Sequence, residues 1–254
     1  MSRAKATTRQ VHTAHFDLQG DIVNITGTTA LVTGSNRGFG RRLAVELLNR
    51  GATVYAGARN PDTVDLPGAK VLALDITDPA SVASAVEIAG DITLLINNAG
   101  SSPASDLLNG DLAQIRFEMD THFFGTLSVI RAFAPKITAN GGGTILNILS
   151  VLSWFSLPGS GAYCAAKSAE WSMTNTLRVQ LAEQNILVAG LHVGYMDTDM
   201  TASISAPKSN PADIAKFAID GIEQDLYEMV ADDISRQVQA SLAGGVPAMY
   251  PQLP

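Results

Sequence analysis

The stretch Thr29-Ala-Leu-Val-Thr-Gly-Ser-Asn-Arg-Gly-Phe-Gly40 decides the fold of this chain. Residues 29–33 carry no charge and predict a buried strand, and an amphipathic helix is predicted directly after the glycines, at residues 38–50. Glycines let the backbone turn tightly, and the N–H groups and dipole at a helix start favour negative charge. We therefore expect the pyrophosphate of a dinucleotide to bind here. The expected contacts are Gly34, Ser35, Asn36, Arg37, Gly38, Phe39 and Gly40.

The alternation of strand and helix continues along the chain. Short uncharged runs predict further strands at residues 53–56, 71–74, 94–96, 144–148 and 187–191. Helices are predicted at residues 79–89, 111–138, 162–184 and 211–224. This order predicts an α/β fold with a doubly wound, Rossmann-like parallel sheet. We expect a flexible N-terminal arm at residues 1–20, a single domain at residues 21–254, and no regular element in the tail from Gly244.

Composition excludes several classes of function. The chain has 254 residues, a formal net charge of −7 and one cysteine, Cys164. An acidic chain does not attract nucleic acid or anionic lipid, so neither partner is expected. A single cysteine forms neither an internal disulfide nor a cysteine cluster, and no metal is predicted. Because no apolar run approaches the ~20 residues of a membrane span and no signal-peptide core is visible, we expect a cytoplasmic protein.

The end of the second strand bears on which dinucleotide binds. NAD-binding domains of this architecture usually place an acidic side chain there, against the adenosine ribose. Here the strand ends at Ala58 and is followed by Arg59. Arg59 and Arg37 of the glycine loop can both donate charge-assisted hydrogen bonds to a 2′-phosphate, so NADP(H) is predicted. The alternative is that both arginines are solvated surface residues.

The third and fourth strands end in residues that suit the rest of a dinucleotide. Asp75 and Ile76 can hold the adenine edge, and Asn98, Ala99 and Gly100 let the chain pass close to a ribose. Both groups lie at carboxyl ends of strands, where such sheets bind ligands. Ordinary turn chemistry is the alternative interpretation.

Three polar side chains near the fifth strand predict acid–base chemistry. Tyr163 and Lys167 lie on one face of a predicted helix, because residues four apart are neighbours there. The ammonium should stabilise the phenolate, so we expect a lowered pKa for Tyr163 and a group able to transfer protons near neutrality. Ser150 closes the preceding strand and can polarise a carbonyl oxygen that faces the phenol.

Over residues 25–225 the sequence resembles the short-chain dehydrogenase/reductase family. The matching motifs, in the family's order, are Thr33-Gly34-x-x-x-Gly38-x-Gly40, Asn97-Asn98-Ala99-Gly100, Ser150, Tyr163-x-x-x-Lys167 and Gly194-x-x-x-Thr198. The resemblance implies that Tyr163 is the general acid/base and that Ser150 orients the substrate. It also implies that Lys167 holds the nicotinamide ribose and lowers the pKa of Tyr163.

The segment after the sixth strand is implied to contact the nicotinamide. The resemblance assigns Thr198 to the carboxamide, with Gly194 and Met196 beside it. Val193 stands where the family usually has proline, so this segment is expected to be less rigid.

A second departure from the family pattern is His122, in the segment Met119-Asp-Thr-His-Phe-Phe-Gly125. The family usually has an asparagine there, which helps to hold a water that relays protons to the lysine. An imidazole can also bond water or pass a proton, so we expect an altered relay whose pH profile reflects histidine titration. The alternative is a histidine that fills a helix kink.

Apolar side chains after Ser150 and Gly194 predict the substrate end. The candidate lining residues are Leu152, Trp154, Phe155, Tyr195 and Met200, with Met196 also within reach. They favour a small, largely apolar ketone, aldehyde or alcohol, although Trp and Phe in such loops can equally be core or subunit contacts.

The sequence therefore predicts an NADP(H)-dependent oxidoreductase that moves a hydride between nicotinamide and a carbonyl or alcohol. The alternatives are a non-catalytic NADP(H)-binding sensor or scaffold, and catalysis that ends in epimerisation or elimination. The long helices at 111–138 and 162–184 carry more apolar residues than covering a sheet requires. Together with family analogy, this favours a homodimer or homotetramer.

Overall fold

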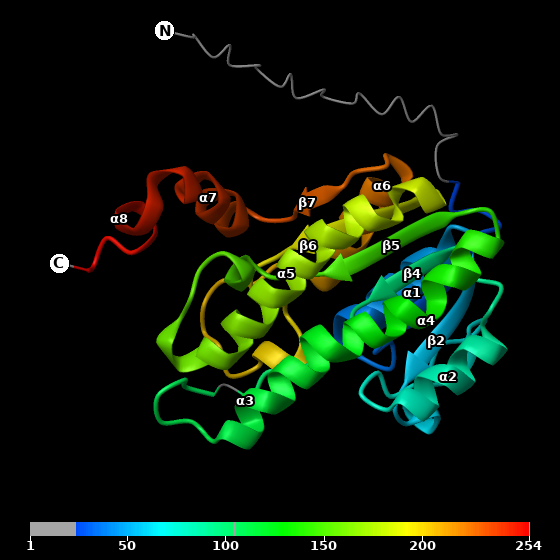
Figure 1. The fold of residues 1–254 in the computed structure, drawn as a ribbon, viewed down its shortest axis with the longest axis horizontal. Coiled ribbons are helices and arrows are strands. Elements are labelled where there is room, and N and C mark those ends of the chain that lie inside the picture. The colour runs from blue at the N-terminus through cyan, green and yellow to red at the C-terminus, as the bar shows by residue number, and fades with distance from the viewer. Residues whose placement is uncertain (1–23, 104, 254) are drawn as a thin grey trace, which may run out of the picture.

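A seven-stranded sheet, parallel throughout, forms the centre of the protein in the computed structural model, which describes residues 24–103 and 105–253. Its strand order is β3-β2-β1-β4-β5-β6-β7 (Figure 1). The strands are β1 (Thr29–Thr33), β2 (Thr53–Ala58), β3 (Lys70–Ala73), β4 (Leu94–Asn97), β5 (Gly143–Ile148), β6 (Ile186–His192) and β7 (Glu228–Val230). The predicted doubly wound α/β fold is confirmed. The predicted arm at residues 1–20 lies outside the described residues.

Helices cover both faces of the sheet and create two apolar cores. On one face, α1 (Gly38–Asn49) and α6 (Pro211–Glu223) bury Leu43, Leu47 and Ile219 against the central strands. On the other face lie α2 (Pro79–Ile88), α4 (Thr126–Ala139) and α5 (Gly161–Leu181), whose core includes Phe133 and Leu177. Such burial of a parallel sheet on both faces explains its uninterrupted apolar strands.

The helix predicted at residues 111–138 is interrupted. It consists of α3 (Leu112–Met119), a π-helical turn η2 (Asp120–Gly125) and α4. Gly125 lies so close to the segment that follows β3 that a Cβ there would be 3.0 Å from the Ile76 side chain. The wider π turn carries His122 into the space beside α5, and π turns of this kind frequently occur at functional sites.

The C-terminal region contains elements that the sequence pattern did not predict. After β7 come α7 (Asp233–Ser241) and the short α8 (Gly245–Met249), so the expectation of no element from Gly244 onward is wrong. Asp232 anchors this region: one of its oxygens caps α7 at Ser235 N, at 2.8 Å, and the other accepts from Gly194 N, at 2.6 Å. Figure 1 shows α7 and α8 at one end of the molecule, beside the segment that follows β6.

Among the described residues, no helix combines the length and apolar character that crossing a membrane requires.

Candidate active site

The glycine loop between β1 and α1 fits a phosphate group. Gly34 and Gly38 have φ values of 66° and 54°, a region that favours glycine. At Gly40 a Cβ would lie 2.3 Å from both the Asn98 side chain and the Gly34 carbonyl oxygen, so no larger residue fits. Helix α1 has no side-chain cap at Arg37 and no acidic residue in its first turn, which leaves its N–H groups available to an anion.

Other side chains of this loop hold the loop itself together. The Ser35 hydroxyl is buried and donates to the Gly57 carbonyl oxygen at 3.2 Å, and the Asn36 amide donates to the Thr63 hydroxyl at 3.1 Å. Phe39 is buried in the core beneath α1. Their backbone groups remain candidates for the cofactor contacts that the sequence predicts.

The two arginines of the predicted 2′-phosphate site both lie on the surface. Arg59 follows the buried Ala58 at the end of β2, and it makes no ion pair with any described residue. Arg37 Nη1 lies 3.6 Å from Asp199 Oδ2, and both side chains are more than 70% exposed, at 73% and 76%. Their guanidinium groups are therefore accessible to a ligand.

Hydrogen bonds tie the end of β4 to the glycine loop. The Thr33 hydroxyl accepts from the backbone N–H groups of Asn98 and Ala99, at 3.0 Å each. The Asn98 amide donates to the carbonyl oxygens of Thr33 and Gly34 at 3.0 and 3.2 Å. The strand ends that flank the change of winding direction, β1 and β4, thus form one rigid rim.

Asp75 and Ile76, predicted at the adenine edge, make local contacts. Asp75 Oδ1 accepts from the backbone and hydroxyl of Thr77, at 2.9 and 2.7 Å, and so closes a turn. Ile76 is buried against Gly125. These contacts match the alternative of turn chemistry, and Asp75 remains partly exposed.

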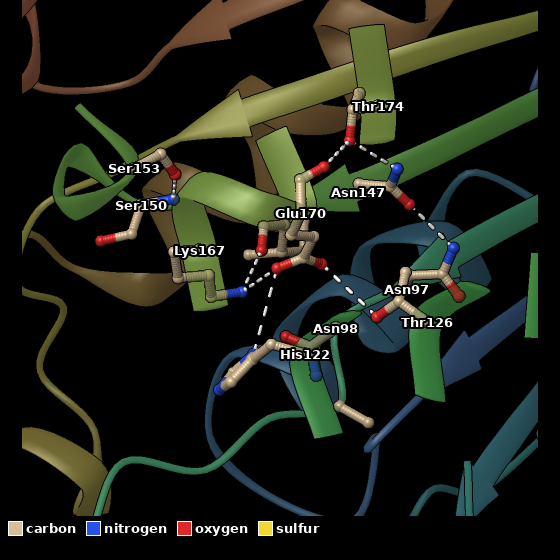
Figure 2. Close-up of polar contacts among 12 residues, drawn as sticks. Asn97, Asn98, His122, Thr126, Asn147, Ser150, Ser153, Lys167, Glu170 and Thr174 are labelled. Carbon is tan, nitrogen blue, oxygen red and sulfur yellow. Dashed lines mark hydrogen bonds and ion pairs between the residues drawn. The ribbon is translucent and has the colours of Figure 1, made fainter. Parts of the chain in front are cut away.

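Lys167 is buried one helical turn from Tyr163 on α5. Its Nζ donates to the Ile148 carbonyl oxygen and to Glu170 Oε2, at 2.7 Å each (Figure 2). The same nitrogen lies 5.8 Å from the centre of the Tyr163 ring. Helix and strand therefore bring the predicted phenol and ammonium together.

The pKa of Tyr163 is shifted in the direction opposite to the prediction. Burial raises this pKa, the Lys167 charge lowers it by less, and the Glu170 charge raises it again. The prediction counted only the ammonium, whereas desolvation of the phenolate outweighs that charge in the protein alone. The Ser150 hydroxyl acts in the opposite direction and lowers the pKa of Tyr163, which indicates that the serine lies near the phenol.

His122 lies at the centre of the site. Its ring packs edge-on against Tyr163 with ring centres 5.1 Å apart, and its Nε2 lies 2.8 Å from the Ser101 carbonyl oxygen. Burial lowers the pKa of His122 well below its usual value, so the ring stays neutral around pH 7. A neutral ring around pH 7 argues against a pH profile set by titration of His122 itself. At Gly100 a Cβ would lie 2.6 Å from His122 Cε1, so the imidazole requires glycine there.

The segment after β6 lies against the glycine loop. A Cβ at Gly38 would lie 3.8 Å from Thr198, and Met196 pairs with Ser209 in an isolated bridge. The N–H of Gly194 is held by Asp232. Thr198, Met196 and Gly194 therefore border the same rim of the sheet as the glycine loop.

A comparison with family models decides the identity. The model described as short chain dehydrogenase matches residues 28–209, which is more than half of the chain. This protein belongs to the short-chain dehydrogenase family. Members of this family are oxidoreductases, and nicotinamide dinucleotides are their typical cofactors.

Several relatives of this short-chain dehydrogenase have been named or solved. Oxidoreductase UcpA of Escherichia coli K12 is 33% identical over 202 residues, which cover 74% of this chain and 76% of the relative. A short chain dehydrogenase from Burkholderia cenocepacia J2315, crystallised with NADP, is 35% identical with a TM-score of 0.87, covering 91% and 99% of the two chains. A 3-ketoacyl-(acyl-carrier-protein) reductase from Brucella melitensis, complexed with NADH, is 24% identical with a TM-score of 0.76, covering 82% and 98%, and shares the fold.

Three of the five candidate lining residues of this short-chain dehydrogenase are engaged in packing. Leu152 is buried beside Cys164. The Trp154 ring stacks on His192 with centres 3.6 Å apart, and Phe155 stacks on Tyr250 at 5.1 Å. A second group remains more accessible: Tyr195 is half-buried and Met200 is 53% exposed.

Sequence reasoning missed two buried carboxyl groups of the site, Glu118 and Glu170. Each is 2% exposed or less, and each contacts a predicted site residue. Glu118 precedes His122 by one helical turn, and Glu170 follows Lys167 by one turn. The available signal was the helical spacing: Glu118 stands four residues before His122 and Glu170 three residues after Lys167, so each pair shares one helix face.

A buried polar ladder beneath the site was also missed. The Asn97 amide donates to Asn147 Oδ1 at 2.8 Å, and the Asn147 amide donates to the Thr174 hydroxyl at 2.9 Å. That hydroxyl in turn donates to the Glu170 carbonyl oxygen at 2.8 Å. As Figure 2 shows, the ladder joins β4 and β5 to α5 and so fixes α5 relative to the sheet.

Proposed function

We propose that the protein is an NADP(H)-dependent oxidoreductase that interconverts a small, largely apolar ketone or aldehyde and its alcohol. The observation that carries this proposal is that Ser150 and the buried Lys167 ammonium both act on Tyr163, with Lys167 Nζ 5.8 Å from the centre of the phenol ring. This cluster lies on the same rim of the sheet as the glycine loop, which fits the pyrophosphate of a dinucleotide.

The chain's own residues divide the proton chemistry among them. When bound, the nicotinamide supplies the hydride in reduction and takes it up in oxidation. Tyr163 gives its hydroxyl proton to the carbonyl oxygen as negative charge develops there, and Ser150 donates a hydrogen bond to that oxygen. The Lys167 charge stabilises the resulting phenolate. In the oxidation direction the same groups withdraw the alcohol proton.

The choice of NADP(H) over NAD(H) follows from charge. Arg59 and Arg37 are exposed cations beside the glycine loop, and the buried Ala58 leaves no carboxylate at the end of β2 to repel a 2′-phosphate. The relative from Burkholderia cenocepacia that was crystallised with NADP supports the same choice.

The apolar character of the substrate rests on Tyr195, Met196 and Met200 in the segment after β6. Ketones, aldehydes and imines of graded size and polarity, each supplied with NADPH, form the direct test. The proposal expects NADPH oxidation with at least one apolar ketone or aldehyde and weak activity with carboxylated substrates.

The competing function is a non-catalytic NADP(H)-binding sensor or scaffold. Tight NADPH binding without turnover of any compound in that panel would favour it. The convergence of Ser150, Tyr163 and Lys167 on one site favours the catalytic function, because binding alone needs no acid–base group.

A further inference from the structure

Four titratable side chains form a continuous buried row between α3 and α5. They are Glu118, His122, Glu170 and Lys167, with exposed fractions of 0%, 2%, 2% and 5%. Glu118 Oε2 lies 3.2 Å from His122 Nε2. His122 Nδ1 lies 4.0 Å from Glu170 Oε2, and that same oxygen accepts from Lys167 Nζ at 2.7 Å (Figure 2). The neutral imidazole thus has one carboxyl group at each ring nitrogen.

The backbone of Ser101 accommodates either tautomer of His122. Its carbonyl oxygen, 2.8 Å from Nε2, accepts a hydrogen bond when Nε2 carries the proton. Its N–H, 3.4 Å from the same nitrogen, donates when the proton is on Nδ1. Rotation of the ring that shortens the distance to Glu170 by about 1 Å would make a hydrogen bond from Nδ1.

No hydrogen bond among the described residues explains why the carboxyl group of Glu118 is buried. Among residues 24–103 and 105–253, neither of its carboxyl oxygens has a hydrogen-bond partner of good geometry, although both are buried. An unsatisfied buried carboxyl group is costly and calls for a role. Burial raises the pKa of Glu118 to about 7 even though the Lys167 charge lowers it, so this group gains and loses a proton near neutral pH.

We propose that Glu118, His122 and Glu170 form a buried proton relay that serves the Lys167–Tyr163 pair. This inference rests on the proposed oxidoreductase function and extends it to two carboxyl groups. It differs from a relay through one ordered water, because each of the proton carriers here is a side chain of the chain itself.

Each turnover moves one proton by one position along this row. In carbonyl reduction, Tyr163 loses its proton to the carbonyl oxygen and regains one from Lys167 Nζ. Glu170 returns a proton to the lysine and takes one from His122 Nδ1, while Glu118 protonates Nε2. Solvent then restores the Glu118 proton, and the imidazole exchanges its Nε2 proton for one on Nδ1, the tautomer that a protonated Glu118 favours. The net uptake is one proton for each carbonyl reduced, and oxidation runs the same sequence backwards.

The relay has a pH dependence with a defined sign. The titratable groups that interact with Glu118 are His122 from η2 and Lys167 and Tyr163 from α5, and Glu170 lies on the far side of His122. Burial raises the pKa of Glu170 as well, but that carboxylate holds the Lys167 ammonium at 2.7 Å, whereas neither oxygen of Glu118 has a hydrogen-bond partner among the described residues. We therefore assign the titration near neutrality to Glu118. Reduction needs a protonated Glu118 and should slow as pH rises through about 7. Oxidation needs the ionised form and should speed up over the same interval.

Nitrogen NMR of the cofactor-free protein labelled with ¹⁵N-histidine tests the relay without a substrate. The His122 resonances are assigned from their loss in His122→Asn. We expect the ring to pass from the Nδ1–H to the Nε2–H tautomer as pH rises from about 6 to about 8.5, while remaining uncharged. This response should vanish in Glu118→Gln and return, at a shifted midpoint, in Glu118→Asp.

The matched control is Glu228→Gln, which removes a carboxyl group 3.3 Å from Nε2 of the other described histidine, His192. It should leave the His122 response intact. A constant His122 tautomer in the wild-type protein, or the same response in Glu118→Gln, overturns the relay.

A kinetic arm separates this inference from the proposed function. The assay uses any carbonyl found active in the panel. In Glu118→Gln, kcat for reduction should no longer fall as pH rises through neutrality, and below about pH 7 it should be about 10-fold lower than in the wild type. Glu118→Asp should restore both the pH dependence and the rate. Unchanged pH profiles in Glu118→Gln together with an inactive Tyr163→Phe would refute the relay alone. A fully active Tyr163→Phe would refute the proposed function instead.

Discussion

At the scale of single residues, the choice of cofactor depends on Arg59. This guanidinium follows the end of β2, is exposed, and makes no ion pair with the described part of the chain. Arg59→Ala should weaken NADPH binding by about 10- to 100-fold, since a hydrogen bond to a charged group contributes about 1.5–3 kcal/mol, and should leave NADH binding nearly unchanged. Fluorescence titration with both cofactors measures this difference. The control Arg131→Ala, on α4, should alter neither affinity, and equal losses for NADPH and NADH in Arg59→Ala would contradict the phosphate assignment.

Glu118 makes a second residue-scale prediction, about stability rather than rate. The folded-state pKa of this carboxyl is about 7, above its ordinary 4.5, so the folded protein binds the proton more tightly than the unfolded chain does. The free energy of unfolding therefore falls as pH rises from about 4.5 to about 7. Glu118→Gln removes this effect and should gain on the order of 2 kcal/mol relative to wild type between about pH 5 and about pH 8. Urea unfolding at both pH values measures the change, and an equal difference at the two values would show that Glu118 is not held protonated by burial.

At the scale of elements, the unit formed by β1, the glycine loop and α1 tolerates no side chain at Gly40. A Cβ there would meet backbone atoms of Gly34, which cannot yield as a flexible side chain does. Gly40→Ala should destabilise the protein by about 1–3 kcal/mol and abolish dinucleotide binding. The control Gly159→Ala adds its methyl group to open space and should leave both properties in place. Thermal unfolding and NADPH titration provide the readouts, and normal binding by Gly40→Ala would show that the loop rearranges freely.

Most strands and helices follow from the sequence because their apolar periodicity is strong. The π turn does not, since its residues continue an ordinary helical pattern and only the close approach of Gly125 to Ile76 distinguishes it. β7 and α8 are too short to leave a periodic signal. At the site, spacing predicted that Tyr163 and Lys167 are neighbours. The direction of the Tyr163 pKa shift could not be predicted, because it depends on burial and on a carboxyl group contributed by packing.

At the scale of the whole molecule, the exposed side of α2, α4, α5 and η2 bears on assembly. Two shallow apolar hollows lie there, and their lining residues include Phe123, Phe124, Leu127, Met173 and Leu177. Phe124 is 55% exposed, which is unusual for a large aromatic side chain near other apolar groups. This face supports the proposal of a homodimer or homotetramer.

Light scattering coupled to gel filtration tests that assembly. We expect a mass of two or four chains for the wild-type protein, and a shift toward the monomer in Phe124→Asp, because the substitution places a charge in the apolar face. Ile88→Asp, which alters an exposed apolar residue of α2 that lines neither hollow, serves as the control and should keep the wild-type mass. A monomeric wild-type protein would contradict the proposed homodimer or homotetramer.

The measurement that bears most directly on the chemistry compares Tyr163→Phe with the wild-type protein in both NADPH binding and carbonyl reduction. We expect kcat/KM to fall by about 10²- to 10⁴-fold while NADPH affinity stays unchanged, because only the proton donor is lost. Tyr55→Phe, which removes a hydroxyl that contacts the Ile88 carbonyl oxygen on α2, should behave like the wild type. Reduction by Tyr163→Phe at the wild-type rate would contradict the assignment of the phenol as the general acid.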